Sequence, residues 1–555
     1  MRKRTEIVSP ELCDDVLSYI GPTLQKHRNC DILDLNPGIG VWSSKIHEYL
    51  KPRTHILLEP QAAAYQNYLD PLLDQEGSTY KLVEKHPHYY TTYEELVNEG
   101  YFPHQTKYDD DDPRSAEQNN TLLVTGCLTV SPRKYSQRTH SKDRHTLHSL
   151  LFNAWDQRLV HAYGKVRILV WTQNIDEAGF LTKSISHKGT DPLVVRKLFN
   201  VRQVVAPRPG ARGIGVSFRD PRYNLQSAAR VVQSMRELGL SIPPHRQSVL
   251  HKLATEIVDK GIENGDLGND GAIQFVEEAA HRGMSTEGLL GEQHRDKVFG
   301  DIALAKDPSL QYTLKTTKKG IKAKLTNWGR MHGYNTSHAV GASRNRQNRC
   351  KRVDMGMEIY RLECELTKTQ DEAEKQKLQA KLSSLNEEFK EAVEDLVPSQ
   401  RAQIPLELDD RLALNSSIPP LDWDRRKFEP LEHRPDEVWP AGKVSLLDFE
   451  PNIVPHGEKL PGDFMDYVKF LKGLQTRYKN SVLQALEIVD PGASELVKSV
   501  PELFDPTKGG RLDLNNLRAR LLTVEMVDAL YKAYMEWPFR SSDLATIDGR
   551  NKRRT

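Results

Sequence analysis

The first half of the chain alternates short apolar runs with stretches whose apolar positions recur at helical spacing. Strands are predicted at Asp31–Leu35, His55–Glu59, Thr121–Thr125 and Val166–Trp171. Helices are predicted at Ser9–Ile20, Val41–Leu50 and His148–Tyr163. Ser9 is placed as the N-cap of the first helix, followed by a proline at its first position. Strands that alternate with helices predict an α/β fold whose parallel sheet is covered on both faces.

The pattern changes near Pro207, and the sequence stays polar to about Pro420. Within this region Pro308–Val353 contains no Asp or Glu, whereas Met355–Leu396 is a charged run with helical character. Apolar positions from Leu378 to Leu396 step by four and three, as in heptads. We therefore interpret 207–420 as an insertion that is largely disordered or helical. The heptads predict pairing with another chain, packing onto this protein itself, or a single charged helix.

Ordered structure is predicted again from Leu421 to Pro440, followed by a strand at Val444–Phe449. Helices are then predicted at Asp463–Leu474, Ser481–Leu486, Leu514–Leu522 and Val524–Trp537. The chain thus divides into an α/β part at 1–206, the insertion at 207–420, a return to the α/β part at 421–450, a helical C-terminal domain at 451–545 and a basic tail at 546–555.

Bulk composition excludes several classes of protein. The 78 basic residues nearly balance the 76 acidic ones, so a basic surface must be local. The five cysteines form no CxxC pair, which favours reduced thiols over a disulfide framework or a zinc site. No apolar run approaches the roughly 20 residues that a membrane span needs. No signal peptide is visible, and early acids such as Glu6 and Glu11 make a mitochondrial presequence inconspicuous.

A glycine-containing turn between a strand and a helix is the clearest chemical feature. It runs Asp34-Leu-Asn-Pro-Gly-Ile-Gly40, and Glu59 ends the next strand, 21 residues after Gly38. Glycines allow a ligand to approach the backbone, and a carboxylate at this spacing is placed to bind ribose hydroxyls. A dinucleotide site is less favoured because GxGxxG is incomplete, with Asn36 and Ser43 at glycine positions. The alternative is a plain tight turn beside a surface carboxylate.

These segments resemble the rRNA adenine N6-dimethyltransferase family and, within it, the fungal mitochondrial transcription factor B group. The resemblance rests on Asp34-Leu-x-Pro-Gly-x-Gly40, Leu57-Leu-Glu59, Tyr163-Gly-Lys-Val166, Glu437-Val-Trp-Pro440 and Tyr534-Met-Glu-Trp-Pro-Phe539. It covers roughly residues 5–206 and 421–545. It implies a class I S-adenosylmethionine-dependent methyltransferase (Rossmann-like) fold. It also implies a cofactor site formed by Asp34, Asn36, Gly38, Gly40, Glu59 and Gly126.

Two departures from the family pattern concern catalysis. The family places an Asn-Leu/Pro-Pro-Tyr/Phe motif after its fourth strand to orient the target adenine. Here Thr125-Gly-Cys-Leu-Thr-Val130 follows, with Gly126 at the asparagine position. The family also has an acidic residue in the loop after its third strand. Here that loop reads Glu84-Lys-His-Pro-His88, and the family's acidic position is not matched. Without groups that orient the amine, methyl transfer is not expected, while a partial S-adenosylmethionine site remains an expectation.

Two further groups of residues bear on ligand binding. The histidines at positions 86, 88, 140, 145 and 148 match no standard metal spacing and are interpreted as loop residues. In 308–353 cations alternate with Tyr312, Trp328 and Tyr334, which favours nucleic-acid binding. The equally open alternative is a disordered basic loop that balances the acidic helix after it.

The resemblance implies a mitochondrial initiation factor that binds mitochondrial RNA polymerase and holds an unpaired strand of promoter DNA between its two domains. Charge clustering selects Arg196, Lys197 and Arg202 on the α/β part, with Lys469, Lys472, Arg477 and Lys479 on the helical domain, as candidate DNA contacts. The first alternative is an active rRNA adenine dimethyltransferase. The second is an RNA-binding ribosome-assembly protein with neither activity.

Overall fold

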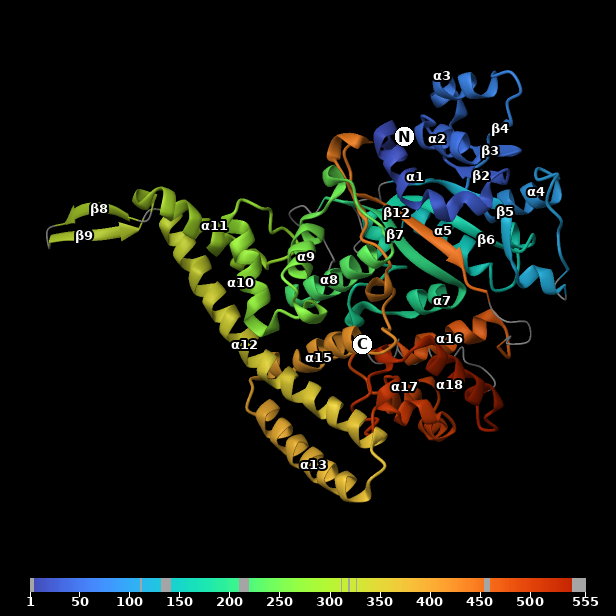
Figure 1. The fold of residues 1–555 in the computed structure, drawn as a ribbon. Coiled ribbons are helices and arrows are strands. Elements are labelled where there is room, and N and C mark those ends of the chain that lie inside the picture. Colours follow the sequence, from blue (N-terminus) through green and yellow to red (C-terminus); the bar gives the residue numbers. More distant parts are fainter. Residues whose placement is uncertain are drawn as a thin grey trace.

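A mostly parallel sheet of eight strands forms the centre of the protein in a computed structural model (Figure 1). The structure describes residues 4–109, 112–130, 141–208, 219–310, 312–317, 320–325, 327–453 and 460–541. The strand order is β10-β7-β12-β6-β5-β2-β3-β4. Strand β12 is antiparallel to both of its neighbours, and the other pairings are parallel. The predicted α/β fold class is confirmed. The 546–555 tail lies outside the described residues.

The sheet strands are β2 Asp31–Leu35, β3 Thr54–Leu58, β4 Tyr80–Val83, β5 Gln118–Leu128, β6 Lys165–Gln173, β7 Phe199–Pro207, β10 Leu431–His433 and β12 Val444–Pro451. The helices around them are α1 Pro10–Leu24, α2 Val41–Leu50, α3 Ala62–Leu73, α4 Tyr90–Asn98, α5 Lys142–Phe152, α6 Asn174–Glu177 and α7 Thr190–Leu198. Ser9 caps α1 by accepting a hydrogen bond from the Leu12 backbone N–H, as its position in the sequence predicts.

Two apolar cores lie on opposite faces of the sheet. One face packs against α1 and α2 through residues such as Leu12, Trp42 and Ile46. The other packs against α5, α7 and the C-terminal helices through residues such as Leu150 and Val194. The strands are therefore buried on both sides, which explains their continuous apolar runs.

The N-terminal segment is tied across the carboxyl ends of the strands. Strand β1, Glu6–Ile7, pairs antiparallel with β11, Val438–Trp439. Arg4 forms a β-bridge with Val130, just beyond the end of β5. The Thr129 hydroxyl also donates a hydrogen bond of 2.6 Å to the Thr5 carbonyl. This segment therefore lies beside the edge where a class I fold binds its ligand.

Three of the predicted helices are wrong in extent. The stretch 148–163 is helical only as the end of α5, and a short 3-10 helix at Leu159–His161 follows it. The stretch 514–522 contains only a 3-10 turn at Ala519–Leu521, because this segment is packed into the core by tertiary contacts. The charged run 355–396 is two helices, since α12 begins far upstream at Asn327 and ends at Lys368, and α13 spans Glu372–Glu394.

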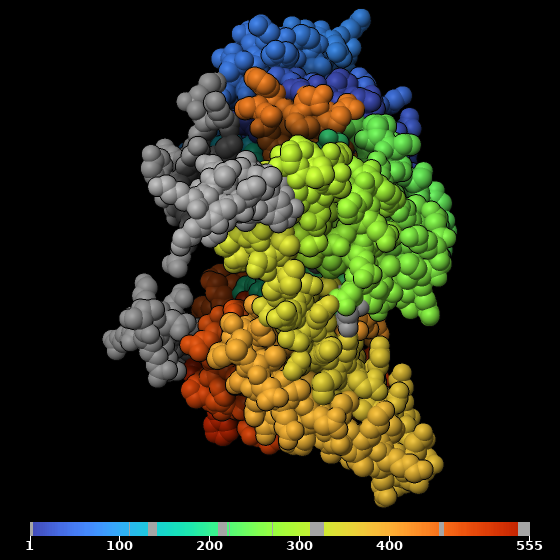
Figure 2. Space-filling view, turned by 90° about the vertical axis from the view of Figure 1, so that its left-hand side faces the viewer, coloured from blue at the N-terminus to red at the C-terminus, as the bar shows by residue number. Residues whose placement is uncertain are grey.

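The described part of the insertion is mainly helical. It contains α8 Pro221–Glu237, α9 Val249–Asp259, α10 Gly268–His281, α11 Glu292–Lys306, the hairpin β8 Tyr312–Thr317 with β9 Gly320–Leu325, and then α12, α13, α14 Pro398–Arg401 and α15 Ile404–Asn415. Helices α8 to α11 share an apolar core of their own. Helices α12 and α13 pack on each other through Ile359, Leu362 and Leu382. The apolar positions of the heptads therefore pack onto this protein itself. Figure 2 shows α12 in yellow beside the green α8–α11 bundle.

The C-terminal domain contains α16 Phe464–Leu474, α17 Val482–Val489 and α18 Val524–Glu536. It contacts the insertion through a buried ion pair between Arg511 and Glu363, with Nε and Oε2 2.7 Å apart, and through a hydrogen bond from the Tyr360 hydroxyl to the Pro506 carbonyl. Within the described residues, no helix combines the length and apolar character needed to cross a lipid bilayer.

Candidate functional site

The loop between β2 and α2 has the backbone shape that its sequence predicts. Asn36, Gly38 and Gly40 have φ values of 53°, 58° and 74°, a region that glycine enters without strain. The Gly38 N–H donates a hydrogen bond of 3.1 Å to Oε2 of Glu59 at the end of β3. The structure thus brings together the loop and the carboxylate that the sequence pairs by their spacing.

The Glu59 carboxylate is fully buried, and Arg4 from the N-terminal segment binds both of its oxygens. The two guanidinium nitrogens of Arg4 donate to Oε1 at 3.3 Å and to Oε2 at 2.9 Å. The Gln61 backbone N–H also donates to Oε1, at 3.0 Å. The hydrogen-bonding capacity that would bind ribose hydroxyls is therefore used by the protein's own arginine.

Arg4 is itself held from a second side by Glu6. Its Nε lies 2.7 Å from Glu6 Oε1, and the Tyr65 hydroxyl donates to the same oxygen at 2.8 Å. Burial disfavours the positive charge of Arg4, but Glu6 and Glu59 outweigh it and raise the pKa of the guanidinium above its ordinary value. The two carboxylates and the arginine therefore form one buried, hydrogen-bonded network in which Arg4 is shared between Glu6 and Glu59.

The space next to Gly38 is filled by this network. A Cβ atom built on Gly38 would lie 2.0 Å from Glu6 Oε2 and 2.9 Å from a guanidinium nitrogen of Arg4. A cavity of about 250 Å³ remains beyond Arg4, lined by Asn36, Pro60, Gln61, His86, His88, Tyr89, Val130 and Lys142. That cavity opens at the carboxyl ends of the strands, but the Glu59 carboxylate is not among its lining residues.

The position of the family's acceptor asparagine has no room for a side chain. Gly126 has a φ of 130°, and a Cβ atom there would lie 2.1 Å from the Leu35 carbonyl oxygen. The Asn36 amide donates to the Cys127 carbonyl at 3.1 Å, closing the strand ends together. Gly126 is thus fixed by the close approach of β2 and β5.

Asp34 is buried at the end of β2 and has a histidine partner. Its Oδ2 lies 3.3 Å from Nε2 of His55, and His55 Nδ1 lies 3.0 Å from Nδ1 of His47. Burial and the neighbouring His55 lower the pKa of His47 to about 4. Because His47 is neutral at pH 7, the Asp34–His55–His47 series is a packed polar contact under the loop.

The three candidate DNA contacts of the α/β part are engaged inside the protein. Arg196 is buried and donates to the Pro419 carbonyl at 3.2 Å. Lys197 Nζ lies 2.5 Å from Asp528 Oδ2 on α18, and Arg202 lies 2.7 Å from Glu450 on β12. These cations hold the α/β part, the C-terminal domain and β12 together, and the structure does not gather them into one open groove.

The candidates of the C-terminal domain lie on its surface. Lys469 is half-buried, 3.9 Å from Asp466. Lys472, Arg477 and Lys479 are exposed at the end of α16 and in the turn before α17, and among the described residues no acidic side chain lies within ion-pair distance of these three. Tyr478 is 39% exposed between two of them. We call Lys472, Arg477 and Lys479 the basic turn; its binding to DNA stays a prediction.

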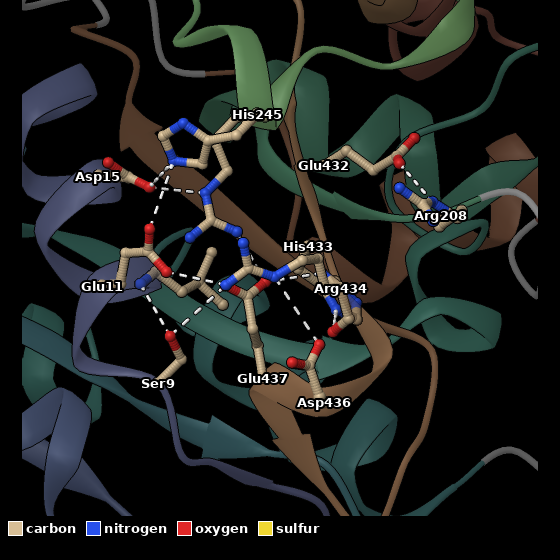
Figure 3. Close-up of polar contacts among 12 residues, drawn as sticks. Ser9, Glu11, Asp15, Arg208, His245, Glu432, His433, Arg434, Asp436 and Glu437 are labelled. Atoms are coloured by element: carbon tan, nitrogen blue, oxygen red, sulfur yellow. Dashed lines mark hydrogen bonds and ion pairs between the residues drawn. The ribbon is translucent and has the colours of Figure 1, made fainter.

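A second polar cluster joins α1 to residues 245–246 and 434–437 (Figure 3). Glu11, Asp15 and His245 offer ligand atoms within 4.8 Å of one another. However, the buried Arg246 lies 2.6 Å from Asp15, and Arg434 lies 2.8 Å from Glu11. Because guanidinium groups already balance both carboxylates, the cluster is better described as the contact that fixes the insertion on α1.

The sequence did not single out Arg4, Glu6 or the crowding at Gly126. The signal was present in Arg2-Lys-Arg-Thr-Glu6, where an arginine precedes a strand pattern by two residues. Only the β-bridge from Arg4 to Val130 brings that arginine to the end of β3. A partner 55 residues away cannot be read from local spacing.

No protein-family model matches the chain. Among curated proteins, it is similar to "Mitochondrial transcription factor 1" of Saccharomyces cerevisiae, at 23% identity over 177 residues. The match covers 32% of this chain and 46% of that protein, so the chain spans about half the length of this relative. The similarity agrees with the family that the motifs indicate.

Proposed function

We propose that the protein is a mitochondrial transcription initiation factor that binds mitochondrial RNA polymerase and assists promoter melting. The observation that carries this proposal is the Arg4–Glu59 contact in a methyltransferase-like fold. In this protein the carboxylate at the ribose-binding position pairs with the protein's own Arg4. A protein with this arrangement would act by binding other macromolecules and not by methyl transfer. The similarity to a mitochondrial transcription factor supports the mitochondrial location and the role in transcription.

The residues around Glu59 do not suit S-adenosylmethionine in this arrangement. Its ribose hydroxyls would need the carboxylate oxygens that Arg4 binds at 2.9 and 3.3 Å. The amine of a target adenine would need a polar side chain to orient it at position 126, where Gly126 leaves no space for one. Both features favour a factor without catalysis over the dimethyltransferase alternative.

The basic turn is the surface that we assign to the unpaired promoter strand. Its cations suit phosphates, and Tyr478 is exposed between them. Lys479 Nζ and Arg520 Cζ lie 5.5 and 5.7 Å from the Tyr478 ring centroid, so a base that stacks on this ring would take the place of one of these cations. This assignment replaces the earlier expectation for Arg196, Lys197 and Arg202, which are engaged in internal contacts.

Run-off transcription tests the proposal. Purified cognate mitochondrial RNA polymerase is given linear DNA with a cognate promoter, with and without this protein. We expect promoter-dependent transcripts only when the protein is present. A variant with Lys472→Gln, Arg477→Gln and Lys479→Gln should lose most of this stimulation, and a pre-melted template should restore it, because the lost step is capture of the opened strand.

The matched control replaces three exposed lysines of the same domain, with Lys498→Gln, Lys508→Gln and Lys532→Gln. It removes the same charge and should keep wild-type stimulation. Absence of stimulation by the wild-type protein, with polymerase active on the pre-melted template, would contradict the initiation function. Equal loss in both triple variants would leave the initiation function standing but remove the basic turn from it.

Cofactor binding gives a separate prediction. In isothermal titration, S-adenosylhomocysteine should show no saturable binding to the wild-type protein, because Arg4 blocks the carboxylate. Arg4→Ala should open the position, and any binding gained should disappear when Glu59→Gln is added. Lys142→Ala, which changes the same cavity wall without touching Glu59, should behave as wild type. Saturable wild-type binding that Glu59→Gln abolishes would show that Arg4 is no barrier.

A further inference from the structure

The insertion carries an arm that projects from the body of the protein. It consists of the β8–β9 hairpin and the first half of α12, and Figure 1 shows the hairpin as the most distant element from the central sheet. The initiation function proposed above does not use this arm. Its sequence, 308–353, contains no acidic residue.

One face of the α12 half of the arm is exposed and basic. Arg330, Tyr334, His338, Arg344 and Lys351 are all exposed. With 3.6 residues per turn, these five positions fall within less than half of the helix circumference. At 1.5 Å per residue, the stripe from Arg330 to Lys351 is about 31 Å long.

The other arginines of this helix half are engaged inside the protein: two have acidic partners, and Arg352 donates to the Ala392 carbonyl at 3.1 Å. Arg346 lies 2.8 Å from Asp220, and Arg349 lies 3.2 Å from Glu407. Trp328 stacks on His332, with ring centroids 5.1 Å apart, so it is not an open platform for a base. The exposed stripe is therefore what remains after internal pairing, and its cations have no acidic neighbour on the same helix half.

The register of the hairpin gathers lysines in the same way. Lys315 stands opposite Lys322, and Thr313 stands opposite Lys324. The register thus brings these three lysines to neighbouring positions along the ribbon.

We propose that this arm binds the phosphate backbone of duplex DNA without regard to sequence. A straight stripe of about 31 Å corresponds to nearly one turn of B-form DNA, which is about 34 Å. A two-stranded ribbon also has the width that the major groove of B-form DNA admits. The inference concerns the arm alone and holds whether or not the protein initiates transcription.

Duplex DNA suits the arm better than other nucleic acids. Single-strand binders alternate cations with aromatic platforms, whereas Tyr334 is the one exposed aromatic side chain on the described stripe. Double-stranded RNA has a narrow, deep major groove that would not admit the ribbon. The arm thus offers charges at intervals along a rod, which is what a duplex backbone requires.

Fluorescence anisotropy of the full chain without polymerase tests the inference. The probes are a labelled 30-base-pair DNA duplex without promoter sequence, the same sequence as RNA duplex, and one DNA strand, each titrated at several salt concentrations. We expect preference for the DNA duplex and a steep salt dependence. Arg330→Gln, Arg344→Gln and Lys351→Gln together should reduce the slope of log K against log salt by about 2.7, which is roughly a hundredfold weaker binding at 0.15 M salt.

The matched control, Lys377→Gln, Lys381→Gln and Lys390→Gln, removes three exposed cations from α13 of the same insertion and should bind as wild type. Circular dichroism checks that both triple variants fold. Equal affinity and slope for the arm variant and wild type would overturn the proposal. Tighter binding of the RNA duplex or of the single strand than of the DNA duplex would overturn it as well if the arm variant loses that binding, since the arm would then belong to another class of nucleic-acid site.

Discussion

Replacing Gly126 by asparagine is expected to destabilise the protein by roughly 4 kcal/mol or more. A Cβ atom at this position would lie 2.1 Å from the Leu35 carbonyl oxygen and 2.4 Å from the Leu35 nitrogen. These are backbone atoms of the neighbouring strand β2, which cannot move without breaking the sheet pairing of Leu35 with Gly126. The φ of 130° adds strain for any side chain. Urea unfolding of the variant and wild type measures the difference.

Gly100→Asn is the matched control for this prediction. Gly100 also has a positive φ, 75°, but a Cβ atom there would have no neighbour within 4 Å. It should cost about 1 kcal/mol, the price of the backbone conformation alone. A wild-type midpoint for Gly126→Asn would contradict the crowding between β2 and β5. A large loss for both variants would assign the effect to backbone conformation.

The Gly126 result also bears on function. If asparagine cannot be accommodated, the acceptor site of the methyltransferase family cannot be restored by one substitution. The close packing of the strand ends would then support the proposed function, which does not involve methyl transfer. This adds an argument independent of the Arg4–Glu59 contact, because the two features lie on different strands.

The second large effect is expected at the ion pair between Arg167 on β6 and Asp448 on β12. Asp448→Asn should cost about 3 to 5 kcal/mol, because it leaves a buried guanidinium without its counter-charge. Both side chains are at most 1% exposed, and Arg167 Nη2 lies 2.7 Å from Asp448 Oδ2. Burial disfavours the charge of Arg167, but Asp448 outweighs it and raises the pKa of the guanidinium. Urea unfolding at neutral pH provides the measurement.

Glu495→Gln serves as the control, because it removes one carboxylate from an exposed pair with Lys498 and should cost less than about 1 kcal/mol. The double variant Arg167→Met with Asp448→Leu should recover much of the loss, since neither charge is then left alone. Stability of Asp448→Asn within about 1 kcal/mol of wild type would mean that the nearby Glu450 carboxylate, which also raises the pKa of Arg167, or the Thr23 carbonyl, which accepts from Arg167, stabilises the guanidinium without Asp448.

This ion pair is also how the chain closes its sheet across the insertion. Arg167 and Asp448 are 281 residues apart, and β12 lies between β6 and β7. The antiparallel strand after the insertion therefore completes the sheet that the first half begins. Because the pair bridges the two parts, its loss is expected to loosen both together.

Local pattern in the sequence determined the central strands and the loop. The run Asp31–Leu35 and the helix Val41–Leu50 were predicted at their exact bounds, because burial on both faces and amphipathic spacing are properties of neighbouring residues. The link between Gly38 and Glu59 followed from spacing, since both end adjacent parallel strands. Strand β12 was likewise visible as an apolar run.

Where tertiary contacts outweighed local preference, the sequence was misleading. The stretch 514–522 has helical spacing but is held in an irregular form by its contacts with the core. Met355–Leu396 reads as one charged run, whereas the turn at residues 369–371 folds it into two helices that pack on each other. Helix propensity is a weak guide when burial decides the conformation.

The tertiary structure decided which partner each charged side chain contacts. Arg4 reaches Glu59 across 55 residues, and Lys197 reaches Asp528 across 331. The sequence counts charges but does not show which carboxylate faces which cation. That choice depends on how sheet, insertion and C-terminal domain meet, because a charge removed from water must find a partner wherever the fold places one. The sequence therefore determined the fold and the cofactor-type loop, and the tertiary structure decided which charges remain for a partner.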